Sequence, residues 1–250
     1  MADTTSIEQI DEDLTIEAPD VSHLVTEDDT PVDNIFCERQ MALLRETLYT
    51  AWSGPGEGRP FVAMGNVALY ATNFLPPLVP DLLLSLDVTL PAEPLLKEHR
   101  SYFLWLYGKP PEVVIEIVSN RKGEELGDKL LDYARLGVSY SIVYDPDGHI
   151  SQAPLRMFVR QGARLVETED RWLGEVALGV TTWPGVYDDM QGVWLRWVDR
   201  KGTLLATGLE AKVQERQRAD QERQRARLLA EKLRELGIDP DSIVAGRSET

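Results

Sequence analysis

A charged residue interrupts the apolar stretch PPEVVIEIVSN at residues 110–120. The valines and isoleucines around Glu116 are typical of a β-strand that is buried on both faces. An ionised carboxylate removed from water is strongly unfavourable unless a cation or hydrogen-bond donors meet it. Such a carboxylate is also a ligand that a hard divalent cation such as Mg²⁺ prefers. Glu116 is therefore the first candidate for a chemical role.

The residues around Glu116 predict a strand–helix–strand unit. A polar turn, NRKGEEL, follows the strand, and the helical pattern GDKLLDYARLG ends at Gly137, a usual residue at a helix C-terminus. The stretch VSYSIVYDPDG then has the pattern of a second strand that ends in an Asp-Pro-Asp-Gly turn. This order predicts two parallel strands joined by a right-handed crossover helix.

Further elements are expected on both sides of this unit. The spacing of Ile35, Met41 and Leu48 predicts a helix over residues 35–52. Residues 61–71 and 79–88 have strand patterns, and residues 91–111 form a long connection with room for one helical turn. Short strands at residues 154–162, 163–169 and 192–199 are expected to form a meander, with residues 184–192 as a turn-rich link. The predicted fold class is α/β, with a mixed central sheet flanked by helices.

The two ends of the chain differ in composition from its middle. Residues 1–40 hold twelve acidic residues and one basic residue, so most of the net charge of −16 belongs to this segment. We expect residues 1–32 to be an acidic, disordered tail and residues 33–207 to be the folded domain. No glycine or proline occurs between Gly208 and Gly237, and this segment is rich in helix formers. The composition predicts a charged helix over residues 208–237, followed by a flexible tail at residues 238–250.

The predicted C-terminal helix allows two interpretations. Leu229, Leu233 and Leu236 have the 4–3 spacing of a coiled-coil seam, but the earlier positions of the same register are mostly polar. A single solvated helix that docks through its last turns fits this pattern. A self-associating coiled coil, and with it a homodimer, also fits.

The composition excludes several classes of site. The only cysteine, Cys37, cannot form an intramolecular disulfide or a cysteine-rich zinc site, and the three histidines have no ligand-like spacing. The N-terminus lacks the pattern of a signal peptide, and no apolar run approaches the roughly 18 residues of a membrane span. We therefore expect a cytoplasmic protein without a membrane segment. The absence of a strongly basic region argues against tight, unaided DNA binding.

Four motifs in their order along the chain resemble those of a known family. They are VPD at residues 79–81, PPEVVIEIVSN at 110–120, GDKLLDYARLGV at 127–138 and YDPDG at 144–148. They are similar to motifs of the Uma-type family of proteins described as restriction endonucleases, in the PD-(D/E)xK nuclease superfamily. The resemblance extends over roughly residues 35–210. It implies a restriction-endonuclease-like core and an endonuclease that hydrolyses DNA with Mg²⁺, for which Mn²⁺ can substitute.

The resemblance also implies which residues act. Asp81 and Glu116 match the two acidic positions of the motif and are expected to bind the metal. The position that is lysine in the simplest members of the superfamily is Val118 here, and the resemblance implies Lys129 on the following helix as its substitute. The acidic residue of the first helix would be Glu38 or Glu46, and the pattern does not decide between them.

The chemistry of phosphodiester hydrolysis agrees with this set of residues. Mg²⁺ takes oxygen ligands at nearly octahedral geometry and keeps several waters, which suits an in-line attack by water. Asp81, Glu116 and the backbone carbonyl of Ile117 would supply part of that shell. The ammonium of Lys129 would polarise the attacking water or stabilise the anionic transition state, which Val118 cannot do.

Each of these residues also has a purely structural interpretation. Asp81 would end a loop, Lys129 would be a surface residue beside Asp128, and Glu116 would form an ion pair with Lys122, Lys129 or Arg135. Weaker candidates for phosphate contacts are Arg100, Arg121 and Lys122, and for base stacking Tyr102 and Trp105. For these weaker candidates, solvated charge and core packing are the commoner explanations.

The sequence leaves three functions open. The first is a Mg²⁺-dependent endonuclease acting on DNA, which Asp81, Glu116 and Lys129 favour. The second is a catalytically inactive protein of the same fold that acts as an interaction module through its C-terminal helix, which Val118 and the acidic excess favour. In the third, the acidic N-terminus mimics DNA and masks the cleft.

Overall fold

A computed structural model of the protein describes residues 18–26, 34–56, 58–119 and 127–236. Its helices and strands are, in chain order, α1 (Ile35–Ala51), β1 (Phe61–Gly65), β2 (Leu69–Tyr70), β3 (Leu82–Leu86), the 3₁₀ helix η1 (Lys97–His99), β4 (Tyr102–Phe103), α2 (Leu104–Tyr107), β5 (Val113–Ile117), α3 (Asp128–Leu136), β6 (Tyr140–Tyr144), β7 (Leu155–Gln161), β8 (Arg164–Thr168), β9 (Trp172–Leu173), β10 (Leu178–Tyr187), β11 (Met190–Val198) and α4 (Gly208–Glu235). None of the helices in these ranges has the length and apolar character needed to cross a membrane.

The centre of the fold is a mixed sheet with the strand order β1-β3-β5-β6-β7-β8. The pair β5 and β6 is parallel, and the other neighbouring strands are antiparallel. The predicted crossover helix between the parallel strands is α3, which ends at Gly137 with a φ of 91°. Both the α/β fold class and this parallel unit are confirmed.

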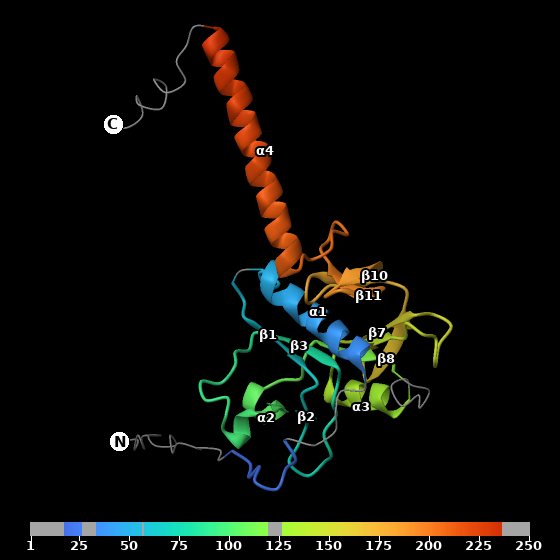
Figure 1. The fold of residues 1–250 in the computed structure, drawn as a ribbon. Coiled ribbons are helices and arrows are strands. Elements are labelled where there is room, and N and C mark those ends of the chain that lie inside the picture. Colours follow the sequence, from blue (N-terminus) through green and yellow to red (C-terminus); the bar gives the residue numbers. More distant parts are fainter. Residues whose placement is uncertain (1–17, 27–33, 57, 120–126, 237–250) are drawn as a thin grey trace, which may run out of the picture.

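The alternation of side chains along β5 sends its apolar residues into two different core clusters. Val113, Ile115 and Ile117 belong to the largest cluster, which includes residues of α1. Val114 packs with Tyr133 of α3 in a second cluster. Thus α1 covers one face of the central sheet and α3 the other (Figure 1). Residues two apart on a strand share a face, so the α3 face also receives the side chain at position 116.

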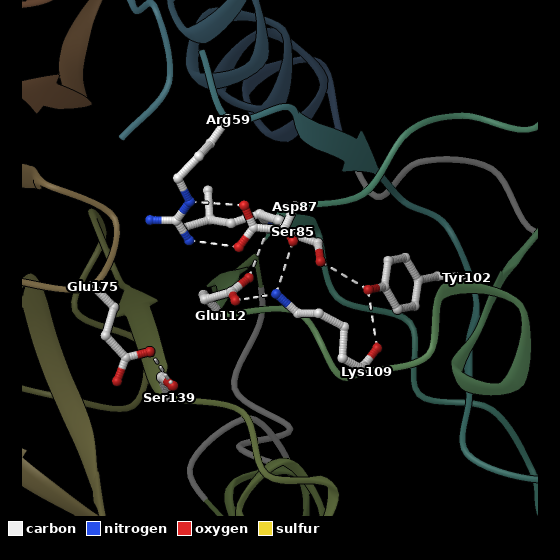
Figure 2. Close-up of polar contacts among 9 residues, drawn as sticks. Arg59, Ser85, Asp87, Tyr102, Lys109, Glu112, Ser139 and Glu175 are labelled. Carbon is white, nitrogen blue, oxygen red and sulfur yellow. Dashed lines mark hydrogen bonds and ion pairs between the residues drawn. The ribbon is translucent and has the colours of Figure 1, made fainter. Parts of the chain in front are cut away.

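Polar side chains close one end of β3 and β5 (Figure 2). The register of the two strands places Leu86 opposite Pro111, which has no N–H to donate. Two side chains replace the missing backbone partner of Leu86. Glu112 accepts from the Leu86 N–H and the Lys109 ammonium donates to the Leu86 carbonyl, both at 2.8 Å. Lys109 and Glu112 also form an ion pair with each other. These contacts stabilise the register of the two strands that carry the candidate acids.

Three strand predictions are wrong in detail. Residues 61–71 are not one strand, because the backbone turns after β1 at Asn66, with a φ of 51°. Much of the expected link at residues 184–192 is strand, and only Asp188 and Asp189 turn the chain, with φ of 45° and 61°. Two successive positive φ values are typical of a tight hairpin. Finally, β11 pairs with β10 in a separate three-stranded sheet and does not extend the meander β6-β7-β8.

The predicted disorder of residues 1–32 is wrong for residues 18–26. Val21 and Leu24 are buried in a cluster with Tyr70 and Phe103. The hydroxyl of Tyr70 donates to the carbonyl of Val25 at 2.6 Å. A few apolar residues therefore suffice to pack this short stretch, although the composition around it is acidic. Residues 1–17, 27–32 and 238–250 lie outside the described part of the chain.

The helix α4 begins at its predicted position and extends away from the rest of the molecule (Figure 1). Thr207 and Glu210 form a capping box at its start, and none of its residues is buried. Docking through the last turns is a wrong prediction, because the contacts lie in the first turn. There the Glu210 carboxylate pairs with the buried Arg196 at 2.7 Å. Self-association of the outer turns stays a prediction.

Candidate active site

The register of the central sheet brings Asp81 and Glu116 together. Leu82 pairs with Ile115 in the antiparallel ladder of β3 and β5, so the next residues outward, Asp81 and Glu116, stand opposite each other. Residues in such positions share a face of the sheet, with Cβ atoms about 4.5–5.5 Å apart. The two acids therefore meet at the end of the ladder, on the face that α3 covers.

The end of β5 adds a third oxygen to this corner. Asp81 Oδ2 accepts a hydrogen bond from the N–H of Ile117 at 2.6 Å. The next N–H, that of Val118, donates to the Tyr144 carbonyl on β6 at 2.8 Å. The C=O and N–H groups of a trans peptide point in opposite directions. The Ile117 carbonyl therefore points away from β6 and toward the strand that begins after Asp81.

Glu116 is a buried carboxylate that receives two donors from one helix. It is only 2% exposed. The Lys129 ammonium lies 2.8 Å from Oε2, and the Tyr133 hydroxyl donates to Oε1. Lys129 and Tyr133 are four residues apart on α3, so they project from the same side of the helix. The crossover helix thus supplies both partners of the buried charge.

Burial raises the pKa of Glu116 to about 7. Removal from water is the largest cause, and the positive charge of Lys129 acts in the opposite direction. The negative charge of Asp81 raises the pKa further, and the hydrogen bonds from Lys129 and Tyr133 lower it. The carboxylates of Asp81 and Glu116 are therefore close enough to repel each other, and a cation between them would relieve that repulsion.

These oxygens fit the donor set of a Mg²⁺ ion. Proteins usually bind Mg²⁺ through one or two carboxylates, with waters and substrate phosphates as the other ligands. Asp81, Glu116 and the Ile117 carbonyl match that set, and a carboxylate that accepts two hydrogen bonds keeps lone pairs for a metal. Among the described residues, no three or more acidic, histidine or cysteine side chains gather as a metal site. The third protein ligand would accordingly be the backbone carbonyl.

The Lys129 ammonium lies at Glu116, whereas the Val118 side chain packs in an apolar cluster. Val118 is buried with Val143 and Phe158 in an apolar cluster next to α3. The Lys129 side chain is 26% exposed while its ammonium contacts Glu116, so the amine lies between the buried acid and solvent. The structure thus brings Asp81, Glu116, Ile117 and Lys129 together, and their catalytic and metal-binding roles stay predictions.

Glu46, one of the two acidic candidates on α1, is engaged away from this corner. Its Oε1 accepts from the Gly208 N–H at 2.7 Å, and its Oε2 accepts from the Tyr187 hydroxyl at 2.9 Å. These bonds join α1 to the start of α4 and to the end of β10. The geometry therefore gives Glu46 a structural role at the junction of three elements.

Glu38, the other candidate on α1, forms an ion pair with its neighbour Arg39 at 2.8 Å. It lines a groove of about 420 Å³ between α1 and β1, together with Gly65 and Asn66. The Asn66 N–H donates to the Asp81 backbone carbonyl at 3.0 Å, so the groove borders the backbone where β3 begins. Of the two glutamates, Glu38 is the one that lines the groove along β1, and a metal-binding role for it stays a prediction.

The weaker candidates have other contacts. Tyr102 is buried, and its hydroxyl bonds with Ser85 at 2.8 Å and donates to the Lys109 carbonyl at 3.1 Å (Figure 2), so it is not an open stacking surface. Trp105 packs against the cluster that holds residues 21–24. Arg100 donates to the Leu95 carbonyl at 2.9 Å within the connection between β3 and β4. The remaining two candidates, Arg121 and Lys122, lie outside the described residues.

Tyr133 is a member of the site that the sequence analysis does not single out. The available signal is its position four residues after Lys129 on a predicted helix, which puts both residues on one face. A tyrosine at that spacing is ordinarily a core residue, and Tyr133 is indeed fully buried. Only the packing of α3 on β5 shows that its hydroxyl meets Glu116.

One family model matches the chain. It is named Uma2, carries the description "Putative restriction endonuclease" and matches residues 38–182, more than half of the chain. The matched range includes Asp81, Glu116, Lys129 and Tyr133. No curated protein gives a significant match.

We expect the burial of Glu116 to make stability depend on pH. An unperturbed glutamate has a pKa of 4.5, whereas Glu116 in the folded protein has a pKa of about 7. Between these values the folded state binds more protons than the unfolded state, so the free energy of unfolding falls as the pH rises. Glu116→Gln lacks this titration. The free energy of unfolding of wild type minus that of the variant should therefore fall by about 3 kcal/mol across the window. Urea denaturation in metal-free buffer measures it, and a difference independent of pH would contradict the burial.

Glu46 and Glu38 should differ in their effect on stability. Glu46→Ala leaves the Gly208 N–H and the Tyr187 hydroxyl without their acceptor, so we expect a loss of about 1–3 kcal/mol in the free energy of unfolding. Glu38 is exposed, and Glu38→Ala should change that free energy by about 0.5 kcal/mol or less. Urea denaturation of both variants measures these changes. Equal losses of unfolding free energy in the two variants would contradict the structural role of Glu46.

Proposed function

This chain belongs to the Uma2 family, and on that basis we propose that it is a Mg²⁺-dependent endonuclease that hydrolyses phosphodiester bonds of DNA, with Mn²⁺ able to substitute. The observation that supports this most is the position of Asp81 opposite Glu116, with Lys129 in contact with the second acid. Two acids from different strands and one amine are the minimum that metal-assisted hydrolysis of a phosphodiester requires from the protein.

Asp81, Glu116 and the Ile117 carbonyl would hold the metal. When bound, Mg²⁺ supplies Lewis acidity at the phosphoryl oxygens and a water of lowered pKa. Asp81 is held in place by the Ile117 N–H, and Glu116 by the hydroxyl of Tyr133. Because these donors come from β5 and α3, the two carboxylates are fixed before substrate arrives. Such preorganisation is a main source of catalytic rate.

Lys129 would stabilise the negative charge that develops on the phosphate. Its ammonium is 2.8 Å from Glu116, and its side chain keeps contact with solvent. A cation bound by the two acids would compensate the charge of Glu116, which leaves the ammonium free to turn toward a substrate oxygen on its flexible stem. The same position allows Lys129 to orient the attacking water. Both roles need an amine beside the two acids, and a lysine on α3 can supply it as well as a lysine on β5.

Metal-dependent cleavage of plasmid DNA tests the proposal. We expect wild-type protein to nick or linearise supercoiled plasmid in Mg²⁺ or Mn²⁺ and to lose activity in excess chelator. Asp81→Asn and Glu116→Gln should each lower the rate at least about 100-fold, and Lys129→Met about 100- to 1,000-fold, because each removes a charge on which the transition state depends.

Asp87→Asn is a matched control for these substitutions. Asp87 lies just after the opposite end of β3, where it forms a surface ion pair with Arg59 (Figure 2), and the substitution should leave the cleavage rate unchanged. Cleavage that survives in both Asp81→Asn and Glu116→Gln would identify a contaminating nuclease. No cleavage, together with no Mg²⁺ binding in calorimetry, would refute the proposal.

The second candidate function is a catalytically inactive protein that binds partners, or a second copy, through α4. The observation that favours it is the exposure of apolar side chains on a helix with no buried residue. Leu228, Leu229 and Leu236 are 56%, 57% and 75% exposed, all in the outer turns. A long polar helix whose outer turns pack on nothing is usually stabilised there by a partner.

Truncation after Arg218 separates the two functions. It removes the outer turns and their leucines but keeps the bonds of Gly208 and Glu210 to the domain. If the protein is the proposed endonuclease, the truncated chain should cleave plasmid at the wild-type rate and unfold at the wild-type urea midpoint. Sedimentation of both proteins reports self-association. Loss of a dimer together with loss of all cleavage would show instead that α4 is part of the catalytic assembly.

A further inference from the structure

The segment between β2 and β3, residues 72–78, is a loop with a fixed shape. At its base the N–H groups of Leu69 and Leu78 donate to each other's carbonyls at 2.7 and 3.0 Å. At its tip the Thr72 hydroxyl oxygen accepts from the N–H groups of Phe74 and Leu75 at 3.2 and 3.3 Å. Backbone bonds at one end and a side-chain cap at the other therefore define residues 72–78, here called the 72–78 loop.

Two more features restrain the 72–78 loop. Pro76 and Pro77 limit its backbone freedom. The His23 ring nitrogen Nε2 lies 2.8 Å from the Asn73 carbonyl, and His23 belongs to the packed stretch that Val21 anchors in the core. The N-terminal stretch thus supports the loop from its side.

The tip of this restrained loop presents apolar side chains to water. Phe74 is 87% exposed and Leu75 is 59% exposed. A loop held by specific hydrogen bonds cannot easily fold these side chains back onto the protein, so their exposure is built into its shape. Exposed apolar groups of this kind mark contact sites more often than a scattered surface leucine does.

The 72–78 loop lies next to the candidate active site. Only Val79 and Pro80 separate it from Asp81. In Figure 1 the teal segment between β2 and β3 extends beyond the end of the sheet where β3 begins. Seven residues span at most about 25 Å, so Phe74 lies within about seven nucleotide steps of a phosphate held at Asp81.

The chemistry of the tip suits a nucleic acid. Phenylalanine, leucine and proline are side chains that DNA-binding proteins insert between base steps as apolar wedges. Aromatic rings also stack on unpaired bases without regard to sequence. A cation contacts the stretch that supports the loop. The Lys97 ammonium donates to the carbonyl of Ser22 at 2.7 Å, and Ser22 precedes the His23 that contacts the loop.

A second copy of the chain fits the tip less well. Its exposed apolar side chains, chiefly those of Phe74 and Leu75, offer on the order of a few hundred Å². A stable interface between proteins buries at least about 1,000 Å². A single protruding aromatic side chain matches the gap between two bases better than it matches a flat protein surface.

We propose that the 72–78 loop contacts the nucleic acid substrate, with Phe74 stacked on or inserted between bases close to the scissile phosphodiester. This inference rests on the proposed function, because the loop is placed by its distance from Asp81. It assigns the loop a part in substrate binding and distortion that is separate from the metal chemistry of Asp81 and Glu116.

Binding to a duplex that carries 2-aminopurine tests the proposal without cleavage. With Ca²⁺ in place of Mg²⁺, full-length wild-type protein should bind the duplex and raise 2-aminopurine fluorescence, which reports loss of base stacking. Phe74→Ala should bind about 10- to 100-fold more weakly and give no fluorescence rise. Phe74→Trp should restore both. Leu95→Ala is the matched control, because Leu95 is 80% exposed on another loop, and it should behave as wild type.

The outcomes separate the loop from the catalytic site. Wild-type binding and unstacking by Phe74→Ala would overturn the inference, whatever the cleavage assay shows. A dimer in wild type that becomes a monomer in Phe74→Ala, with DNA binding unchanged, would overturn it in favour of a second copy. Unstacking that depends on Phe74 in a protein that never cleaves DNA would keep the loop as a DNA contact and refute the endonuclease.

Discussion

The burial of the Glu116 carboxylate is the constraint on which the site depends. A charge at this depth is tolerated only where donors meet it, and both protein donors come from α3, the ammonium of Lys129 and the hydroxyl of Tyr133. The helix must therefore pack on the face of β5 that carries Glu116, and in one rotation about its axis. A helix that connects two parallel strands packs on the sheet they belong to, and the acid fixes which side of α3 faces inward. Fold and site are specified by the same contact.

The second requirement is the register of β3 against β5. A slip of one residue would send Asp81 to the face opposite Glu116, because side chains alternate along a strand. The far end of the ladder opposes such a slip, since Lys109 and Glu112 bind the backbone of Leu86 where proline leaves it without a partner. A charged pair at one end of the two strands thus stabilises the meeting of two acids at the other. Lys109 and Glu112 satisfy backbone groups, whereas Asp81 and Glu116 keep oxygen lone pairs for a cation.

The sequence predicts what local pattern controls. The strand around Glu116, the helix that ends at Gly137 and the parallel strand after it follow from periodicity and turn residues, and together they place Lys129 over the sheet. Other features depend on contacts between distant segments. That Glu46 binds the start of α4 while Glu38 lines the groove along β1 follows from how α1 packs, because both are acids on the same helix. The role of Tyr133 and the packing of residues 18–26 are hidden in the sequence for the same reason.

The charge of the chain bears on how it could hold DNA. A net charge of −16 provides little of the general phosphate attraction on which most DNA-binding proteins rely. Under the proposed function, attraction would be concentrated where a divalent cation and Lys129 meet the scissile phosphate. The remaining affinity would come from contacts that do not depend on charge. A restrained loop that carries an exposed phenylalanine seven residues before Asp81 would be such a contact, since stacking on bases requires no cation. An acidic nuclease of this design would bind weakly to intact duplex and favour sites where base stacking is already loosened, because the wedge then has less unstacking to perform.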